Sequence, residues 1–390
     1  MHKDHISHTD STAISLLRLP LALAIVFIHL NIHASGADIH WQAFGLTDLF
    51  RLTVCVVTNQ LAGLAVPLFF IISGFLFFNG CSDREHYPTM WRFFKKRFAR
   101  RGRSLLIPYV LFNLVALVGL VSHYTTMGKS LTDAVGLCIG GGKWLRAFWD
   151  IHTTGFTTNL LGITKPIAYP IDAPMWFVRD LMVVVIMSPL VYWATRRISW
   201  WWVAVLTVLA MVGLWIPLAG FSVTSCLFFS IGACLSICAH NIGHTLHGWR
   251  RVIVPLAIIA MVGDIWTDGT KADTYIHMVF LLSGTLTLLW LATLWASACD
   301  NNGGMVWRYV ITRGGEASFF IYATHALLIP CWGMRPVEWV MSQVWTNSTN
   351  GILCIGQYLL AAVATFALCL VAFDILKRLC PRALAFAMGR

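Results

Sequence analysis

Arg18 and His29 lie in the apolar run that begins at Ala13, and a charged group and an imidazole are costly in a lipid environment. Ten residues separate them, so on a helix they would lie about 20° apart around the axis and roughly 16 Å apart along it. This spacing indicates a long ligand along one helix face, with its anionic part near Arg18 and its reacting end near His29. The alternative is that Arg18 extends to the membrane surface and His29 makes a buried hydrogen bond.

Tyr322 and His325 are three residues apart near the end of another apolar run, so they would share a helix face. One interpretation is that they are packed polar residues that bond across the bundle. The other is that they bind substrate in the same cavity as His29. The remaining histidines lie mostly in loops or near the ends of apolar runs, and we interpret them as solvated.

Trp176, Arg179 and Asp180 open another apolar run, and they suggest a saccharide-binding edge. An aromatic ring can stack on the flat C–H face of a sugar, and charged groups can bind its hydroxyls. The alternative is an interfacial aromatic residue beside an ion pair, which is common at the ends of membrane helices. The preceding segment 124–174 has no apolar stretch long enough to span a membrane, and we expect it to cover the acceptor side with Trp144, Trp149 and Asp172.

A basic run from Trp91 to Arg103 also has two interpretations. Arginine presents a fork of donors that matches phosphate oxygens, so the run could clamp phosphates together with Arg18. The alternative is topological, with positive charge held at the cytoplasmic face beside anionic lipids. The candidate phosphate ligands in the run are Arg97, Arg100, Arg101 and Arg103.

The composition excludes an ordinary soluble domain. The chain has 390 residues, of which 58% are hydrophobic and 12% charged, whereas soluble domains have about 25% charged residues. The net charge of +11 reflects basic loops beside membrane helices rather than nucleic-acid binding. The eleven cysteines are scattered without disulfide or zinc spacing, and we expect no metal site, no permanently bound cofactor and no cleavable signal peptide.

The apolar runs predict an all-α membrane bundle that forms a single domain over residues 1–390. We expect about ten membrane-spanning helices with both termini cytoplasmic, because the loops assigned inside hold most of the Lys and Arg. Segment 124–174 would then be external. The expected spans are 13–33, 52–78, 104–123, 175–194, 199–217, 221–239, 252–267, 275–298, 316–333 and 351–376.

Taken together, these stretches resemble acyltransferase family 3, the bacterial integral-membrane O-acyltransferases that modify surface polysaccharides. The resemblance covers essentially the whole chain in the family's order, and the Arg18–His29 spacing is its most specific part. The chain departs from the pattern at Pro67, where many members carry an acidic residue, so the acid that would orient His29 is unassigned. The other matching stretches are Phe69-Phe-Ile-Ile-Ser-Gly-Phe-Leu, the basic run leading into Ile107-Pro-Tyr, Met175-Trp-Phe-Val-Arg-Asp-Leu, and Ser318-Phe-Phe-Ile-Tyr-Ala-Thr-His.

The resemblance implies an enzyme of the bacterial inner membrane that uses cytoplasmic acyl-CoA, most simply acetyl-CoA, as donor. The acceptor would be a hydroxyl of a cell-surface saccharide or of its lipid-linked precursor. It implies His29 as the essential catalytic group, acting with Arg18 as base or acyl carrier, and the CoA phosphates would meet Arg18 and the cluster Arg97–Arg103.

Two other functions remain open at this point. A transporter or flippase of a small polar or saccharide substrate would also place polar residues in its spans, although no inverted repeat is evident. A haem-binding electron carrier would need two histidines at similar depth, and His29 with His325 is the plausible pair.

Overall fold

The computed structural model describes residues 6–30, 32, 34–81, 87–160, 163–214, 216, 218–239, 242–302, 304–327, 332–344 and 350–390. The far ends of the expected spans 13–33 and 316–333 lie partly outside these residues. The α-helices are α1 His8–His29, α2 Leu46–Val54, α3 Ala65–Phe78, α4 Tyr87–Arg101, α5 Ile107–Thr126, α6 Leu131–Ile139, α7 Trp144–Ala147, α8 Trp176–Ile186, α9 Ser188–Ile198, α10 Trp200–Met211, α11 Val223–Cys234, α12 Ile242–Thr267, α13 Asp273–Asn302, α14 Met305–Thr324, α15 Met334–Val344, α16 Gly351–Leu379 and α17 Pro381–Ala387.

Short helical turns of other types connect these helices. The 3₁₀ turns are η1 Gly36–Asp38, η2 Trp41–Ala43, η4 Ala62–Leu64 and η6 Ala173–Met175, and the π-helical turns are η3 Cys55–Leu61, η5 Gly102–Leu106 and η7 Leu235–Ala239. The described residues also contain one antiparallel hairpin of β1 His152–Leu160 and β2 Ile163–Tyr169. This hairpin lies in segment 124–174, where the sequence predicts no membrane-spanning helix.

The protein is a polytopic helical bundle, as the sequence predicts. Among the described residues, helix length and composition give five candidate membrane spans, which are His8–His29, Leu46–Phe78, Met90–Thr126, Asp273–Cys299 and Gly351–Leu379. The count rises to seven if two bent helix pairs each form one span. The expected number of about ten is therefore not confirmed.

One of these bent pairs corresponds to the expected span 175–194. Helices from Ala173–Ile186 and Ser188–Ile198 meet at 62°. The bend follows from Pro189, which has no backbone N–H and cannot continue the helical hydrogen-bond pattern of α8.

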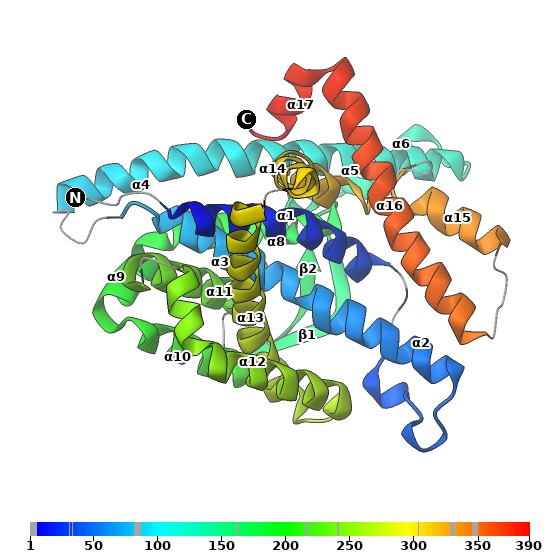
Figure 1. Cartoon of the computed structure of the whole chain (residues 1–390). Coiled ribbons are helices and arrows are strands. Elements are labelled where there is room, and N and C mark those ends of the chain that lie inside the picture. The colour runs from blue at the N-terminus through cyan, green and yellow to red at the C-terminus, as the bar shows by residue number, and fades with distance from the viewer. Residues whose placement is uncertain are drawn as a thin grey trace.

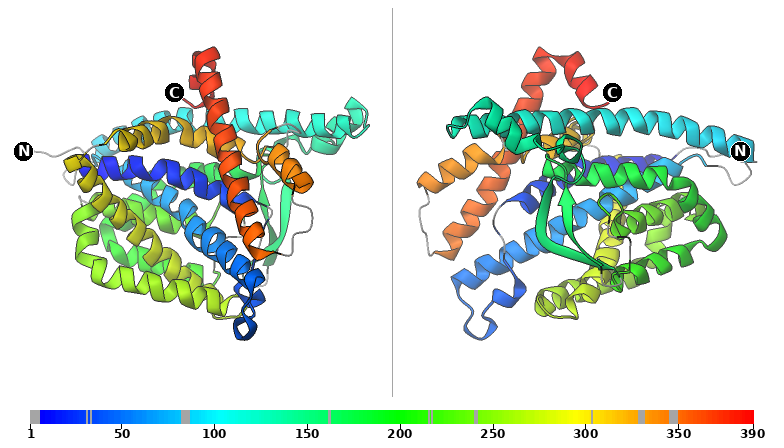
Figure 2. Two further views of the ribbon diagram at one scale, coloured as in Figure 1. Left: turned by 45° about the vertical axis from the view of Figure 1, so that its right-hand side comes forward. Right: turned by 180° about the vertical axis from the view of Figure 1, so that it is seen from behind.

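The long helices cross one another around α1 and α3 (Figure 1). The N-terminus and α4 lie toward one end of the molecule, and α6 and α15 lie toward the other (Figure 1). Seen from behind, the hairpin lies beneath α5 and beside α8 (Figure 2). This arrangement gives the ends of α1 different surroundings, with the basic α4 near one end and the hairpin segment near the other.

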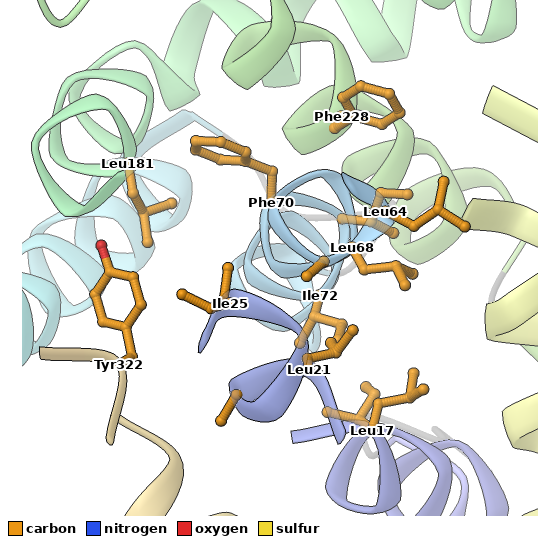
Figure 3. Close-up of a cluster of buried hydrophobic side chains, with 14 of the residues drawn as sticks. Leu17, Leu21, Ile25, Leu64, Leu68, Phe70, Ile72, Leu181, Phe228 and Tyr322 are labelled. Atoms are coloured by element: carbon orange, nitrogen blue, oxygen red, sulfur yellow. The ribbon is translucent and has the colours of Figure 1, made fainter. Parts of the chain in front are cut away.

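Part of the core lies where α3 meets α1 and α11. Figure 3 shows Leu17, Leu21 and Ile25 of α1 beside Leu68 and Ile72 of α3. Glycines let α3 and α11 approach closely, because an added Cβ at Gly74 would lie 2.1 Å from Phe229 O and one at Gly232 would lie 2.0 Å from Ile71 O. Small residues of this kind are typical of tightly packed membrane helices.

The basic run differs from the expected loop because it is helical. From Met90 the chain continues through α4, the π-helical turn η5 and α5 to Thr126 as one long helix. Lys and Arg are good helix formers, so a polar run can extend an apolar helix beyond its membrane-spanning part. The arginines therefore occupy fixed helix positions rather than positions in a loop.

Helix α1 is fixed at its N-terminal end and along its N-terminal half. The Ser7 side chain caps it by accepting from Asp10 N at 3.0 Å, and the Asp10 carboxylate accepts from the backbone N–H of Ile242 and Gly243 at the start of α12. Nearer its middle, α1 packs against α14 at Gly314, where an added Cβ would lie 3.2 Å from Ser15 O. The rotation of α1 about its axis is thereby set, which fixes where its polar side chains point.

Candidate active site

The structure brings His29 and His325 together. His29 is the last residue of α1 and His325 caps the C-terminus of α14. The two ring centroids lie 4.8 Å apart at an interplanar angle of 68°. Rings in such direct contact leave no room for a haem iron between them, so the pair does not fit the electron-carrier hypothesis.

Backbone hydrogen bonds determine which nitrogen of each ring can act as a base. His29 Nδ1 lies 2.9 Å from Ile25 O, and His325 Nδ1 lies 3.0 Å from Ile321 O and 2.9 Å from Tyr322 O. A carbonyl oxygen only accepts, so each Nδ1 must carry the proton and donate it. In the neutral rings Nε2 is then the basic nitrogen of both histidines.

The two Nε2 atoms have different surroundings. His325 is completely buried, and its Nε2 has no hydrogen-bond partner among the described residues. His29 is half-buried and has no carboxylate partner in the described part of the chain. The orienting group of His29 is therefore a backbone carbonyl, which agrees with the absence of an acidic residue at Pro67.

Arg18 lies on the same helix as His29, at a half-buried position where α14 carries two successive glycines. An added Cβ at Gly315 would lie 3.6 Å from Arg18 Nη1, so the absence of side chains there leaves space beside the guanidinium. Arg390, the last residue, donates from Nη2 to Gly315 O at 2.6 Å and lies within electrostatic range of Arg18. Sequence reasoning missed Arg390, because a basic tail after the last span was interpreted only as a topology signal.

The basic helix α4 brings further cations to the same place. Arg101 lies within electrostatic range of Arg18, and Arg97 and Arg100 are its other cationic neighbours. Arg97 is held by donation to Asn79 O and by its position over the Phe93 ring, at 5.1 Å from the centroid. Arg103 is exposed, and its backbone packs against Gly389 of the C-terminal tail.

These cations have no carboxylate partner within the part of the chain that the structure describes. Among the described residues, none of Arg18, Arg97, Arg100 and Arg101 forms an ion pair with a carboxylate. Like charges gathered in this way repel one another, so the arrangement is favourable only when an anion lies between them. We name this group of four arginines and Arg390 the arginine cluster.

Three of the sequence stretches singled out above meet at one aromatic ring. Phe177 of α8 contacts Phe70 of α3 at a centroid distance of 4.6 Å, Phe69 at 5.9 Å and Tyr322 of α14 at 5.9 Å. Tyr322 also donates its hydroxyl proton to Pro174 O, just before α8. This packing sets the position of α14 one turn before His325.

Arg179 and Asp180 form a buried ion pair with an N–O distance of 2.9 Å. Arg179 also donates from Nη1 to Trp149 O at 2.6 Å and to Ala168 O at 3.0 Å, and its guanidinium lies over the Trp149 ring. The pair therefore ties α8 to α7 and to the end of β2. Trp176, the first residue of α8, is half-buried beside it, and Trp144 and Trp149 are exposed at 57% and 39%.

Asp172 lies just before α8 and is fully buried. Its backbone N–H donates to Asn113 Oδ1 at 3.1 Å, whereas its Oδ2 has no partner among the described residues. Burial raises the pKa of Asp172 well above its usual value. A carboxyl in this state holds a proton more readily than a surface aspartate does.

The site has two parts along one helix. Near the middle of α1, at Arg18, the arginine cluster has no carboxylate partner among the described residues, and at the C-terminal end of α1 two imidazoles present basic nitrogens. Helical geometry places Arg18 and His29 roughly 16 Å apart along α1. A long, thin, anionic ligand would lie between them with its reactive group beside His29.

Comparisons with known proteins point in the same direction. A family model described as an acyltransferase domain matches residues 11–374. Succinoglycan biosynthesis protein ExoH of Rhizobium meliloti (strain 1021) is 24% identical over 392 residues, in a match that covers 97% of this chain and 92% of that protein. No solved structure matches the chain.

Proposed function

This chain belongs to the acyltransferase domain family, and we propose that it transfers an acyl group from acyl-CoA to a saccharide hydroxyl. It is a multi-pass membrane protein, and we place its acceptor on the outer side of a bacterial cytoplasmic membrane. The relative ExoH, whose name refers to succinoglycan biosynthesis, supports a polysaccharide or its lipid-linked precursor as acceptor. The observation that carries the proposal is the pairing of His29 with His325 at the C-terminal end of α1, with the arginine cluster about three helical turns away at Arg18.

The arginine cluster supplies what the phosphates of CoA need. Guanidinium groups bind phosphate oxygens through charge-assisted, often bidentate hydrogen bonds. Arg18 is the member on α1, so phosphates held there would direct the pantetheine arm along this helix toward His29. Arg97, Arg100, Arg101 and Arg103 would bind the remaining charge, and the chain needs no permanently bound cofactor in this scheme.

The chemistry assigned to His29 follows from its tautomer. Its Nδ1–H is held by Ile25 O, so Nε2 can take the proton from the acceptor hydroxyl as that oxygen attacks the thioester carbonyl. The C–S bond then breaks, the CoA thiolate leaves, and the proton on Nε2 passes to the thiolate sulfur. The alternative is that Nε2 attacks the thioester first and passes the acyl group to the hydroxyl in a second step.

His325 would contribute through its contact with His29. Its buried Nε2 lacks a partner among the described residues, so it is available to a substrate hydroxyl or to a proton that leaves His29. Tyr322 positions α14 through its bond to Pro174 O rather than through a free hydroxyl. We therefore propose His29 as the catalytic residue and His325 as a substrate-binding residue beside it.

The acceptor would enter past α8. Trp176 offers a half-buried aromatic face at the start of this helix, next to the exposed Trp149. Arg179 and Asp180 are bound to each other and to backbone carbonyls, so their effect on an acceptor would come through the position of Trp149 and the hairpin.

The experiment that tests the proposal follows both products of the reaction. Purified protein in phospholipid nanodiscs is given acetyl-CoA labelled in the acetyl group, with the host strain's surface glycan as acceptor. We expect label in the glycan and an equal amount of free CoA thiol. Exposed His247 of α12 provides a matched control, and His247→Ala should behave as wild type. The same protein is also placed in sealed phospholipid vesicles, where label that crosses the membrane without reaching the glycan would instead indicate a transporter.

A further inference from the structure

A polar cavity of about 220 Å³ lies near the C-terminal end of α1, apart from the histidine pair. It is enclosed by the π-helical turn η3, the end of α12, the start of α13 and the residues around Gly36. Cys55, Asn59 and Gln60 of η3 all line it, and π-helical turns are frequent at functional sites because they redirect side chains. The volume is several times the roughly 30 Å³ that one water occupies.

Two buried oxygen atoms in the cavity wall have no hydrogen-bond donor among the described residues. Gln60 and Asp264 are each only 3% exposed. Gln60 donates from Nε2 to Asp264 Oδ2 at 2.6 Å, and since a carboxylate only accepts, this bond fixes the amide so that Oε1 faces elsewhere. Within the described part of the chain, Gln60 Oε1 and Asp264 Oδ1 have no hydrogen-bond partner. Buried acceptors left in this state are costly, so the cavity favours a ligand that donates hydrogen bonds.

The rest of the wall is also rich in acceptors. Asp273 lies beside Asp264, and Asp268 accepts from Ser35 Oγ and from Gly36 N at 2.9 and 2.8 Å. His277 donates its Nδ1–H to Asp264 Oδ2 at 3.0 Å, which leaves Nε2 as an acceptor in the neutral ring. No Lys or Arg of the described chain lines the cavity, so an anionic ligand would be repelled.

Exposed aromatic rings stand beside the cavity. Trp266 directly follows Ile265, a lining residue, and its ring lies 5.7 Å from that of Trp41. Phe44 continues the stack at 6.1 Å from Trp41. The three side chains are exposed at 68%, 43% and 45% in the order Trp266, Trp41, Phe44. Aromatic faces next to hydrogen-bond acceptors suit a sugar, which has a flat C–H face and a rim of hydroxyl donors.

The cavity is close to the reactive end of α1. Thr58 of η3 donates to Phe27 O, two residues before His29, and Gln60 of the same turn bonds to Asp264. The Cα atoms of residues 58 and 60 are at most about 7.6 Å apart, because consecutive Cα atoms are 3.8 Å apart. Asn59 also donates to Ala34 O, in the segment that follows α1.

From these contacts we infer that the cavity binds an uncharged sugar residue of the acceptor glycan. Its hydroxyls donate to Asp264 and Gln60, and the next sugar of the glycan stacks on Trp266 and Trp41. This second acceptor subsite is separate from the Trp176 region, and its assignment to the acceptor rests on the proposed function. Its carboxylates exclude a uronate at the same position.

The inference is tested by direct binding, without any acyl donor. The full chain is placed in phospholipid nanodiscs, which avoids glycoside detergents, and saturation-transfer NMR measures binding of methyl β-D-glucopyranoside and methyl β-D-galactopyranoside. Glucuronate serves as the anionic probe. The variants are Asp264→Asn in the wall, Trp266→Ala on the surface and His29→Ala. Trp201, which is 76% exposed on α10, provides the matched control Trp201→Ala.

We expect at least one neutral glycoside to bind to wild type, Trp201→Ala and His29→Ala alike, with glucuronate excluded. Loss of a hydrogen bond or of a stacking face should weaken binding in Asp264→Asn and Trp266→Ala by about fivefold or more. Unchanged glycoside binding in both variants, or tighter binding of glucuronate, would overturn the inference. Binding is measured without an acyl donor and also in His29→Ala. A sugar site in the cavity would therefore be supported even if the protein showed no acyl transfer. If Asp264→Asn and Trp266→Ala both transfer the acyl group with the wild-type KM for the acceptor, the proposed subsite is overturned but the proposed function is not.

Discussion

Arg18 and Arg179 are both partly or fully buried arginines, yet their surroundings are opposite. Every bond found for Arg179 is internal, because it pairs with Asp180 and donates to the carbonyls of Trp149 and Ala168. Arg18 has no carboxylate partner in the described chain and lies near Arg101 and Arg390 instead. A satisfied charge stabilises a scaffold, whereas a gathered and unpaired charge indicates a ligand. We therefore propose two roles for the same residue type, and each proposed role predicts a different response to mutation.

The largest effect is expected at the reactive end of α1. His29→Ala removes the proposed base, and general acid–base catalysis typically contributes about 10²- to 10⁴-fold, so acyl transfer should fall by that factor. The measurement is glycan labelling by folded protein, with His247→Ala as control. Turnover of His29→Ala within a few-fold of wild type would remove His29 from the mechanism.

Mutation of Arg179 should mainly lower the stability of the protein. Arg179→Met leaves Asp180 buried without a partner, and breaking a buried ion pair costs about 3–5 kcal/mol. The unfolding temperature of the purified protein should fall markedly, and Arg179→Lys should recover only part of the loss because lysine lacks the fork of donors. Wild-type stability together with weakened acceptor binding in Arg179→Met would instead indicate that Arg179 binds the sugar directly.

Mutation of Arg18 should instead mainly weaken the binding of the acyl donor. Arg18→Ala removes a charge-assisted contact of about 1.5–3 kcal/mol, which raises the KM for acyl-CoA roughly tenfold or more and leaves the acceptor KM unchanged. Exposed Arg251 of α12 provides the control Arg251→Ala. If acyl-CoA affinity is the same in Arg18→Ala and Arg251→Ala, Arg18 only extends to the membrane surface.

Trp176 lies between these two cases, because it is half-buried and close to the Arg179 scaffold. Trp176→Ala should reduce transfer to the saccharide by about fivefold, the effect of roughly 1 kcal/mol. Slow hydrolysis of acyl-CoA by water does not use the sugar site and should persist. Equal losses of both activities on folded protein would make Trp176 a packing residue.

The smallest effect is expected at Asp172, whose pKa is raised by burial. The folded state then binds the proton more tightly than the unfolded chain, so stability is lost as the pH rises above the unfolded pKa of about 3.9. Asp172→Asn cannot ionise and should gain stability relative to wild type between about pH 5 and pH 8. A difference in unfolding temperature that does not vary with pH would contradict this assignment.

Sequence periodicity and composition were sufficient to predict the helical membrane bundle. They also predicted that Arg18 and His29 share one face of a helix. The sequence left open whether Tyr322 and His325 share a cavity with His29, and the ring contact between His29 and His325 appears only in the structure. Local patterns did not show the hairpin at 152–169, because its Thr and Gly content is also typical of irregular loops. They also did not show that the basic run continues α5 as a helix.

Other parts of the site depend on contacts between distant residues. Arg390 reaches Gly315 only because the tail folds back onto α14. Gln60 and Asp264 are 204 positions apart, so no local pattern joins them. By contrast, the hydrogen bond from His29 Nδ1 to Ile25 O, which fixes the His29 tautomer, joins residues four apart on one helix. That spacing is visible in the sequence.

The most direct test separates donor binding at Arg18 from chemistry at His29. Equilibrium binding of acetyl-CoA and release of free CoA thiol are measured on wild type, His29→Ala and Arg18→Ala in nanodiscs. If the arginines bind the donor and His29 carries out the transfer, His29→Ala binds acetyl-CoA as wild type does but releases no thiol. Arg18→Ala then binds about tenfold more weakly and still reacts at saturating donor. Thiol release by His29→Ala at the wild-type rate, or undiminished acetyl-CoA binding by Arg18→Ala, would contradict this division.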